Sequence, residues 1–109
     1  MKIKDIIGSE ETKVGDIPTK ENTLEQKILD SLSTIELKTL ITKHQNFLGT
    51  IIINLLKEQV KLQKEYRVLS KPMMYSFGMA IRNVYRFGKA EFNKNTLKLI
   101  HEFERVYGI

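Results

Sequence analysis

The residues of this chain with the clearest chemistry are cations spaced along one predicted helix, the third of the chain, which ends near Phe87. At 100° per residue, five side chains share one side of this helix at spacings i, i+4, i+7, i+11 and i+14: Tyr75, Met79, Arg82, Arg86 and Lys89. An arginine donates two parallel hydrogen bonds to a phosphate, and a tyrosine among cations can stack on an unpaired base. The pattern therefore predicts a surface that contacts the phosphate backbone of DNA or RNA.

The distribution of charge along the chain agrees with this prediction. The formal net charge is +5, yet residues 1–56 hold seven Lys/Arg against eight Asp/Glu, whereas residues 57–98 hold ten against three. No carboxylate lies between Tyr66 and Ala90. Such a local excess of positive charge is typical of binding to a polyanion. Lys94 and Lys98, near the start of the last predicted helix, are expected to extend the same surface.

The same cations fit two further interpretations. Charged side chains also belong on any solvated helix face, and a basic surface can bind an acidic protein instead of a nucleic acid. A second group, Lys57, Lys61 and Lys64, is better explained as a solvated surface, because Glu58 and Glu65 are spaced to pair with Lys61.

The sequence lacks the residue patterns of catalysis and of metal binding. The chain has no cysteine, which excludes disulfides, thiolate metal sites and a cysteine nucleophile. His44 and His101 fall on different predicted helices, without metal-ligand spacing, and His44 is expected to be a hydrogen-bonded core residue. Phosphate-binding loops, dinucleotide fingerprints and nucleophile elbows are absent from the sequence. We therefore expect a protein that is not an enzyme and that needs no cofactor and no metal.

The elements that must position the cations form an all-α fold, predicted as a small bundle of about four helices, one of them long. Thr23 and Ser33 begin the first two helices, each followed three residues later by the Gln or Glu of a capping box. Apolar residues then recur at spacings of four and three from residue 34 to residue 69, which would make a helix of about 54 Å. A domain of this size has a radius of gyration of roughly 13 Å. We therefore expect a break near Gly49 or an antiparallel pair, with a homodimer through the apolar seam as the alternative.

The last two helices are predicted from shorter patterns. Ser70 and Pro72 suit the start of the third helix, and Gly88 its end. Its apolar arc is expected to comprise Met73, Phe77, Ala80, Ile81, Val84 and Phe87. Asn95 is predicted to cap the fourth helix and Gly108 to close it, with four inward residues: Leu97, Ile100, Phe103 and Tyr107.

These elements give a helical domain over residues 23–109, preceded by a flexible tail or docking segment over residues 1–22. No stretch is long and apolar enough for a membrane span, and the N-terminus lacks the features of a secretory signal. We therefore expect a cytoplasmic protein without membrane contact.

Residues 32–41 resemble a leucine-rich segment in the small helical subunits of type III CRISPR effector complexes. The resemblance covers about ten residues and transfers no site residue. It implies a small helical subunit of a ribonucleoprotein complex as one alternative function. Our main hypothesis is a non-enzymatic nucleic-acid-binding accessory protein. The other alternative is a phage- or plasmid-type adaptor or inhibitor that grips a protein partner through the long apolar seam and the N-terminal tail.

Overall fold

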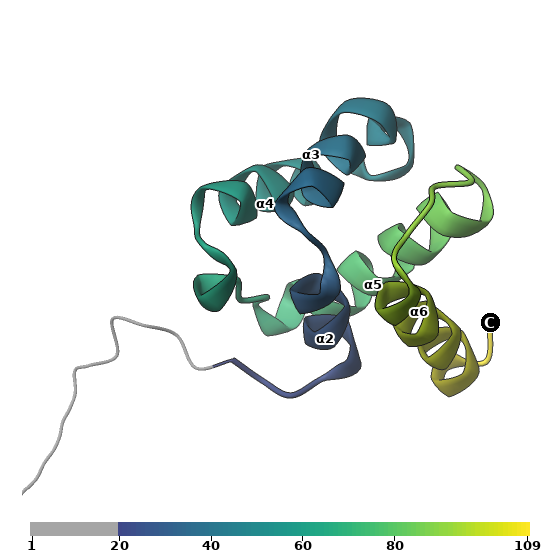
Figure 1. Ribbon diagram of the computed structural model, residues 1–109. Helices are drawn as coiled ribbons and strands as arrows, with labels where there is room; N and C mark the ends of the chain where they lie inside the picture. The colour runs from purple at the N-terminus through teal and green to yellow at the C-terminus, as the bar shows by residue number, and fades with distance from the viewer. Residues whose placement is uncertain (1–19) are drawn as a thin grey trace, which may run out of the picture.

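The computed structural model describes residues 20–109, and the tail or docking segment predicted for residues 1–22 lies outside this range except for its last three residues. The prediction of an all-α fold is confirmed, since the described part holds helices and no strand (Figure 1). None of these helices is both long and apolar enough to cross a membrane. The α-helices are α2 (Leu24–Ser31), α3 (Thr34–Lys43), α4 (Gly49–Lys61), α5 (Lys71–Arg86) and α6 (Lys94–Tyr107), with two 3₁₀ turns, η1 (Gln45–Phe47) and η2 (Lys64–Tyr66).

The first two helices begin where their capping signals predict. The Thr23 hydroxyl accepts a hydrogen bond from the backbone N–H of Gln26 at 3.1 Å. At the start of α3, the Ser33 hydroxyl accepts from the N–H of Glu36 at 3.0 Å, while the Glu36 carboxylate accepts from the N–H of Ser33 at 2.8 Å. Both caps satisfy backbone donors that a helix leaves unpaired in its first turn.

The single long helix predicted over residues 34–69 is wrong, and the predicted break near Gly49 is confirmed. The α3 helix ends at Lys43, and α4 begins at Gly49, whose φ of 76° favours glycine and interrupts an α-helix. The two helices pack against each other. Because of this break, the described part has five α-helices, where the sequence predicts about four. His44 is not a core residue, because it ends α3 and is only half-buried. Ile51, predicted to lie in the seam, is exposed.

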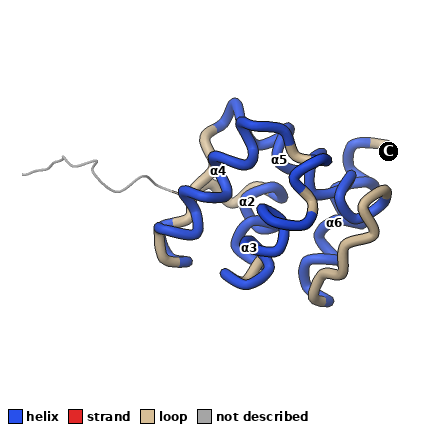
Figure 2. The backbone as a smooth tube through the Cα atoms, turned by 90° about the horizontal axis from the view of Figure 1, so that it is seen from above, coloured by secondary structure: helices blue, strands red, loops and turns tan. Residues whose placement is uncertain are grey.

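The helices share one hydrophobic core. The α2 helix packs against both α5 and α6, and α4 packs against α5 (Figure 1). Seen along a perpendicular direction, α4 and α6 lie at opposite ends of the domain, with α2 and α5 between them (Figure 2). Six of the fully buried apolar side chains show how every helix contributes: Ile28, Leu37, Leu56, Phe77, Ile81 and Phe103.

A buried polar network holds the segment between α4 and α5 in place. The Gln26 amide donates to the carbonyl oxygen of Arg67 at 2.9 Å and accepts from the N–H of Leu69 at 2.8 Å. Arg67 is only 2% exposed, and its guanidinium donates to the carbonyl oxygen of Leu32 and to the Thr34 hydroxyl. Burial lowers the pKa of Arg67. One of the cations in the acid-free stretch is therefore a structural residue that is closed to a phosphate.

Candidate nucleic-acid interface

The interface is built on α5 and α6, and a local signal ends each of the two helices. The first turn of α5 contains Pro72, as the sequence predicts. At its end, the N–H groups of Phe87 and Gly88 both donate to the carbonyl oxygen of Asn83, at 2.8 and 3.3 Å, so the helix stops there. Gly108, with a φ of 69°, closes α6 as predicted.

The predicted N-cap of α6 is wrong by two residues. Asn93, not Asn95, accepts a hydrogen bond from the backbone N–H of Thr96, at 2.9 Å. The amide of Asn93 also donates to the carbonyl oxygen of Ser31 and to the Glu36 carboxylate, at 2.9 and 3.0 Å. These tertiary contacts join the start of α6 to the α2–α3 corner and select Asn93 as the cap. Burial alone would raise the pKa of Glu36, but the hydrogen bonds from Ser33 and Asn93 outweigh it and lower that pKa.

A glycine on α5 lets α6 approach closely. A Cβ atom on Gly78 would lie 2.4 Å from Cε1 of Phe103, far inside van der Waals contact. The absence of that Cβ lets the buried Phe103 ring lie directly against the α5 backbone. The same approach sets the next polar side chains of α5 beside the carboxylate of Glu104.

Arg82 and Arg86 share that carboxylate. Arg82 Nε lies 3.0 Å from Glu104 Oε2, while Arg86 Nε and Nη2 lie 2.6 Å from Oε2 and Oε1, respectively. Although no carboxylate lies near them in the sequence, both cations are therefore compensated by an acid. Sequence reasoning missed the partner because it lies 22 positions from Arg82 along the chain. The side chain of Glu104 is only 9% exposed, against 18% for Arg82 and 41% for Arg86.

The shared carboxylate stays charged at neutral pH. The hydrogen bonds from Arg86 hold the pKa of Glu104 at about 2, with Arg82 assisting and burial opposing. The same bonds raise the pKa of Arg86. Two cations around one anion leave one positive charge. Arg86 Nη1 makes no hydrogen bond to the described residues, so its donors remain for a ligand.

The exposed face of α6 carries further cations. Lys94, Lys98, His101 and Arg105 follow each other at spacings of four, three and four, and all four are exposed. Arg105 pairs with Glu102, whereas Lys94 and Lys98 form no ion pair with any described residue. We call Arg86, Lys89, Lys94, Lys98 and His101 the basic face.

Two residues of the predicted surface lie apart from the basic face. The Tyr75 ring is 51% exposed but packs with aromatic rings of α6, its centroid 6.1 Å from that of Phe103 and 5.1 Å from that of Tyr107. Tyr107, predicted to face inward, is itself partly exposed, because α6 ends beyond the edge of the core. Met79 is half-buried against the core, not outside as predicted. Tyr75 stands about two helical turns before Arg82 and contributes an aromatic contact within the fold.

One exposed aromatic residue was missed. Phe87, predicted in the apolar arc, is 63% exposed, and the Arg82 guanidinium carbon lies 5.6 Å from its ring centroid. The helical wheel fails here because Phe87 is the C-cap, where the 100° repeat ends. The predicted helix end at Gly88 was the signal that could have indicated an exposed Phe87. Lys89, in the following turn, has a φ of 55°, which is rare for a residue other than glycine.

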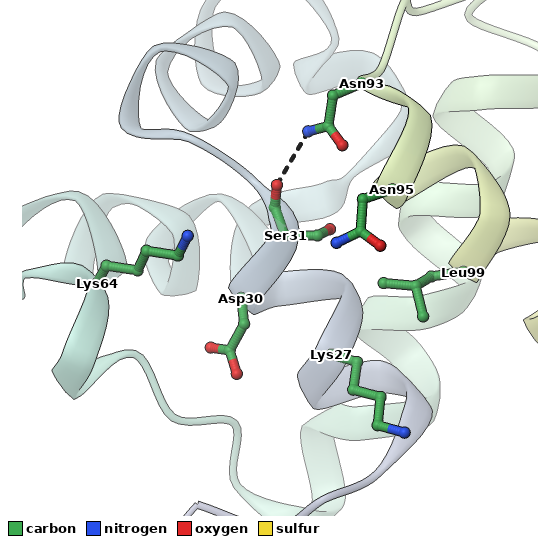
Figure 3. A pocket seen from close by; sticks show the side chains of 7 residues that line it. All are labelled: Lys27, Asp30, Ser31, Lys64, Asn93, Asn95 and Leu99. Carbon is green, nitrogen blue, oxygen red and sulfur yellow. Dashed lines mark hydrogen bonds between the residues drawn. The ribbon is translucent and has the colours of Figure 1, made fainter.

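A polar pocket of about 440 Å³ lies beside the first turn of α6, open to solvent (Figure 3). Several of its polar groups are engaged in the fold: Asp30 accepts from Lys20 Nζ at 3.1 Å, and Asn93 donates to the Ser31 carbonyl. The described residues contain no group of three His, Asp or Glu side chains that could hold a metal ion. The pocket thus places two lysines, Lys27 and Lys64, near α6. Its lining comprises Lys27, Asp30, Ser31, Lys64, Asn93, Asn95 and Leu99.

The prediction for the second lysine group, a solvated surface with ion pairs, is confirmed only in part. Lys57, Lys61 and Lys64 are exposed, but neither Glu58 nor Glu65 forms an ion pair with Lys61 within the described part of the chain. Lys64 turns instead toward the polar pocket, where its carbonyl oxygen accepts from Lys20 Nζ at 3.2 Å. The three lysines therefore belong to two different surfaces.

Comparison with protein-family models, with curated proteins and with solved structures finds no match to this chain, so the resemblance of residues 32–41 to type III CRISPR subunits gains no support.

Proposed function

We propose that this protein is a non-enzymatic nucleic-acid-binding accessory protein that contacts the phosphate backbone through the basic face. The observation that carries the proposal is the shared, nearly buried carboxylate of Glu104, which fixes the Arg82 and Arg86 guanidiniums in one orientation. A fixed guanidinium loses less conformational entropy when it binds a phosphate. Arg86 therefore presents a pre-oriented donor, and Lys94 and Lys98 are exposed on α6, the helix that carries Glu104.

The role of each residue follows from its position. Arg86 supplies directional hydrogen bonds to a phosphate oxygen, whereas Lys94 and Lys98 act as point charges along the neighbouring backbone. Arg82 is mostly buried and supports Arg86 indirectly, by sharing Glu104. His101 Nδ1 lies 3.6 Å from Glu104 Oε1, so this exposed side chain borders the carboxylate that Arg82 and Arg86 share.

The test is fluorescence anisotropy with labelled single-stranded DNA, duplex DNA and RNA at several salt concentrations. We expect the variant Lys94→Gln with Lys98→Gln to bind more weakly and to lower the salt slope by about 1.5 to 2, because two phosphate contacts are lost. These lysines are chosen over Arg82 and Arg86, whose removal would strand the Glu104 charge. The matched control, Lys57→Gln with Lys61→Gln, removes the same charge from α4. Equal effects of the two variants, or no binding at low salt, would refute the proposal.

A second candidate function is supported by a groove between α3 and α4. The groove has a volume of about 440 Å³, and its apolar floor is flanked by lysines without any carboxylate in its lining. Such a groove suits an acidic amphipathic helix of a partner protein, with apolar residues on the floor and carboxylates on the lysines. The lining residues are Lys38, Ile41, Thr42, Lys57, Val60 and Lys61.

The two functions separate by mutation. Lys38→Glu with Lys57→Glu reverses the charge of the groove and leaves the basic face intact, so an adaptor would lose its partner while nucleic-acid binding persists. The opposite result is expected for Lys94→Glu with Lys98→Glu. Loss of both activities when either surface alone is changed would favour a subunit of a ribonucleoprotein complex, which uses the groove and the basic face together.

A further inference from the structure

Resting on the proposed function, we propose that Phe87 is a base-stacking residue and that the nucleic acid is single-stranded where it meets this protein. The inference concerns the tip of the domain, where α5 ends. Here a large exposed aromatic ring lies beside the Arg82 guanidinium, and two further exposed cations, Arg86 and Lys89, lie one residue before it and two residues after it in the chain. Exposed aromatic rings beside cations are the usual platform for unpaired bases.

The environment of the ring leaves it open on one side and supported on the other. The guanidinium carbon of Arg82 lies 5.6 Å from the Phe87 ring centroid, within the range of a cation–π contact. That guanidinium is in turn fixed by Glu104 at 3.0 Å. The ring therefore rests on a held cation, yet 63% of Phe87 remains exposed for a second partner.

The turn after Phe87 is tightly constrained. A Cβ on Gly88 would lie 2.8 Å from the Val84 carbonyl oxygen and 3.1 Å from Cε2 of Phe47, so only glycine fits there. The chain then places Lys89 at a φ of 55°. Lysine is unfavourable in this conformation compared with glycine or asparagine, and residues held in such conformations cluster at functional sites. The turn keeps a cation two residues from the ring, where it can meet the phosphate of a stacked nucleotide.

Stacking on Phe87 distinguishes between strand types. In a duplex the base faces are covered by their neighbours, so an exposed ring gains nothing from them, and binding relies on phosphate contacts alone. In a single strand the bases are free to stack on an aromatic side chain. The inference therefore predicts tighter binding of single strands than of duplexes of equal length.

The first test compares variants of the ring in the full chain, with labelled oligothymidylate and a duplex as probes. We expect Phe87→Ala to weaken single-strand binding by about 5- to 100-fold, with duplex binding nearly unchanged. Phe87→Tyr keeps an aromatic face and should bind within about threefold of the wild type. The control is Tyr66→Ala, which removes another exposed aromatic ring, 46% exposed, from η2 on a different surface. An equal loss in Phe87→Ala and Tyr66→Ala would overturn the inference.

The second test uses the absence of tryptophan from the chain. In the variant Phe87→Trp the only indole sits at the proposed stacking site, so oligothymidylate should quench its fluorescence, whereas Tyr66→Trp should not respond. Salt-dependent binding without quenching, and with wild-type affinity of Phe87→Ala, would overturn the stacking inference while the proposed function stands. Absence of binding by the wild type to every probe at low salt would overturn both.

Discussion

Two arginine sites of this molecule use the same side chain for opposite purposes. Arg67 is 2% exposed and donates to a backbone carbonyl and to a hydroxyl, with no carboxylate among its hydrogen-bond partners in the described residues. Arg86, on α5, holds a carboxylate and keeps its side chain 41% exposed. The first site joins segments of the chain, and the second presents charge to solvent.

The difference shows that a run of cations without acids in the sequence has no single meaning. Arg67 and Arg86 belong to the same acid-free stretch, and only the tertiary structure separates them. A basic surface is therefore better defined by exposure and by the partner of each cation than by net charge. On this criterion the basic face gathers at the end of α5 and along α6.

The largest effect is expected from Arg67→Met, which tests the buried site. The substitution leaves the Leu32 carbonyl without its donor, and the unfolding free energy should fall by about 3 kcal/mol. Urea denaturation measures this loss. Nucleic-acid binding by the folded variant should not change, and a loss of binding at conditions where the variant is folded would break the comparison.

A somewhat smaller effect is expected from Gly78→Ala, which moves α6 away from α5 without altering any charge. The added methyl group overlaps the Phe103 ring and should cost about 2 kcal/mol of stability. It should also loosen the Glu104 site. Thermal unfolding measures the first effect, and a weaker, still salt-dependent anisotropy signal the second. Unchanged stability would show that the close approach of Phe103 to the α5 backbone does not stabilise the fold.

Glu104→Gln tests the exposed site directly through pH. The folded-state pKa of about 2 lies below the ordinary value of 4.5, so the ionised carboxylate stabilises the fold above pH 4.5, and this contribution is lost as the pH falls toward 2. The exposure of Arg86 reduces the contribution to on the order of 2 kcal/mol. The variant should be less stable at pH 7 and lose less stability between pH 4.5 and 2. Parallel stability profiles of wild type and variant would contradict the assignment.

The smallest effect is expected from Lys89→Gly, and it has the opposite sign for stability. Glycine adopts the positive φ of this turn without strain, so the variant should gain up to about 1 kcal/mol, reduced by the greater entropy of its unfolded chain. Loss of the cation should weaken nucleic-acid binding about two- to threefold. A gain in stability together with a loss of affinity would show that Lys89, like Arg86, serves the exposed site and not the fold. Lys89→Asn serves as the control, since asparagine also tolerates this conformation and carries no charge.

Much of the fold was predictable because its signals are local. Thr23 and Ser33 each act through a backbone group three residues away, and Gly49 and Gly108 act through their own conformation. The site was predictable only in part. Lys94 and Lys98 are exposed on one helix face, as any helical wheel indicates, but the wheel could not show that Glu104 meets Arg82 and Arg86. That contact depends on how α6 crosses α5, which is a tertiary property. The prediction that Phe87 lies in the apolar arc was wrong because the helical wheel was continued to a residue where the helix ends.

The contact between the first and last described helices has a consequence for synthesis of the chain. The Tyr107 hydroxyl donates to the Glu25 carboxylate at 2.6 Å, and α2 packs on α6. During translation, α2 leaves the ribosome long before α6 does. The apolar face of α2 therefore stays unpacked until α6 is synthesised. The α3–α4 pair needs no later segment for its mutual packing and can form first. The domain can close only after α6 has emerged as well, because the α2–α6 contact joins residues that are far apart along the chain.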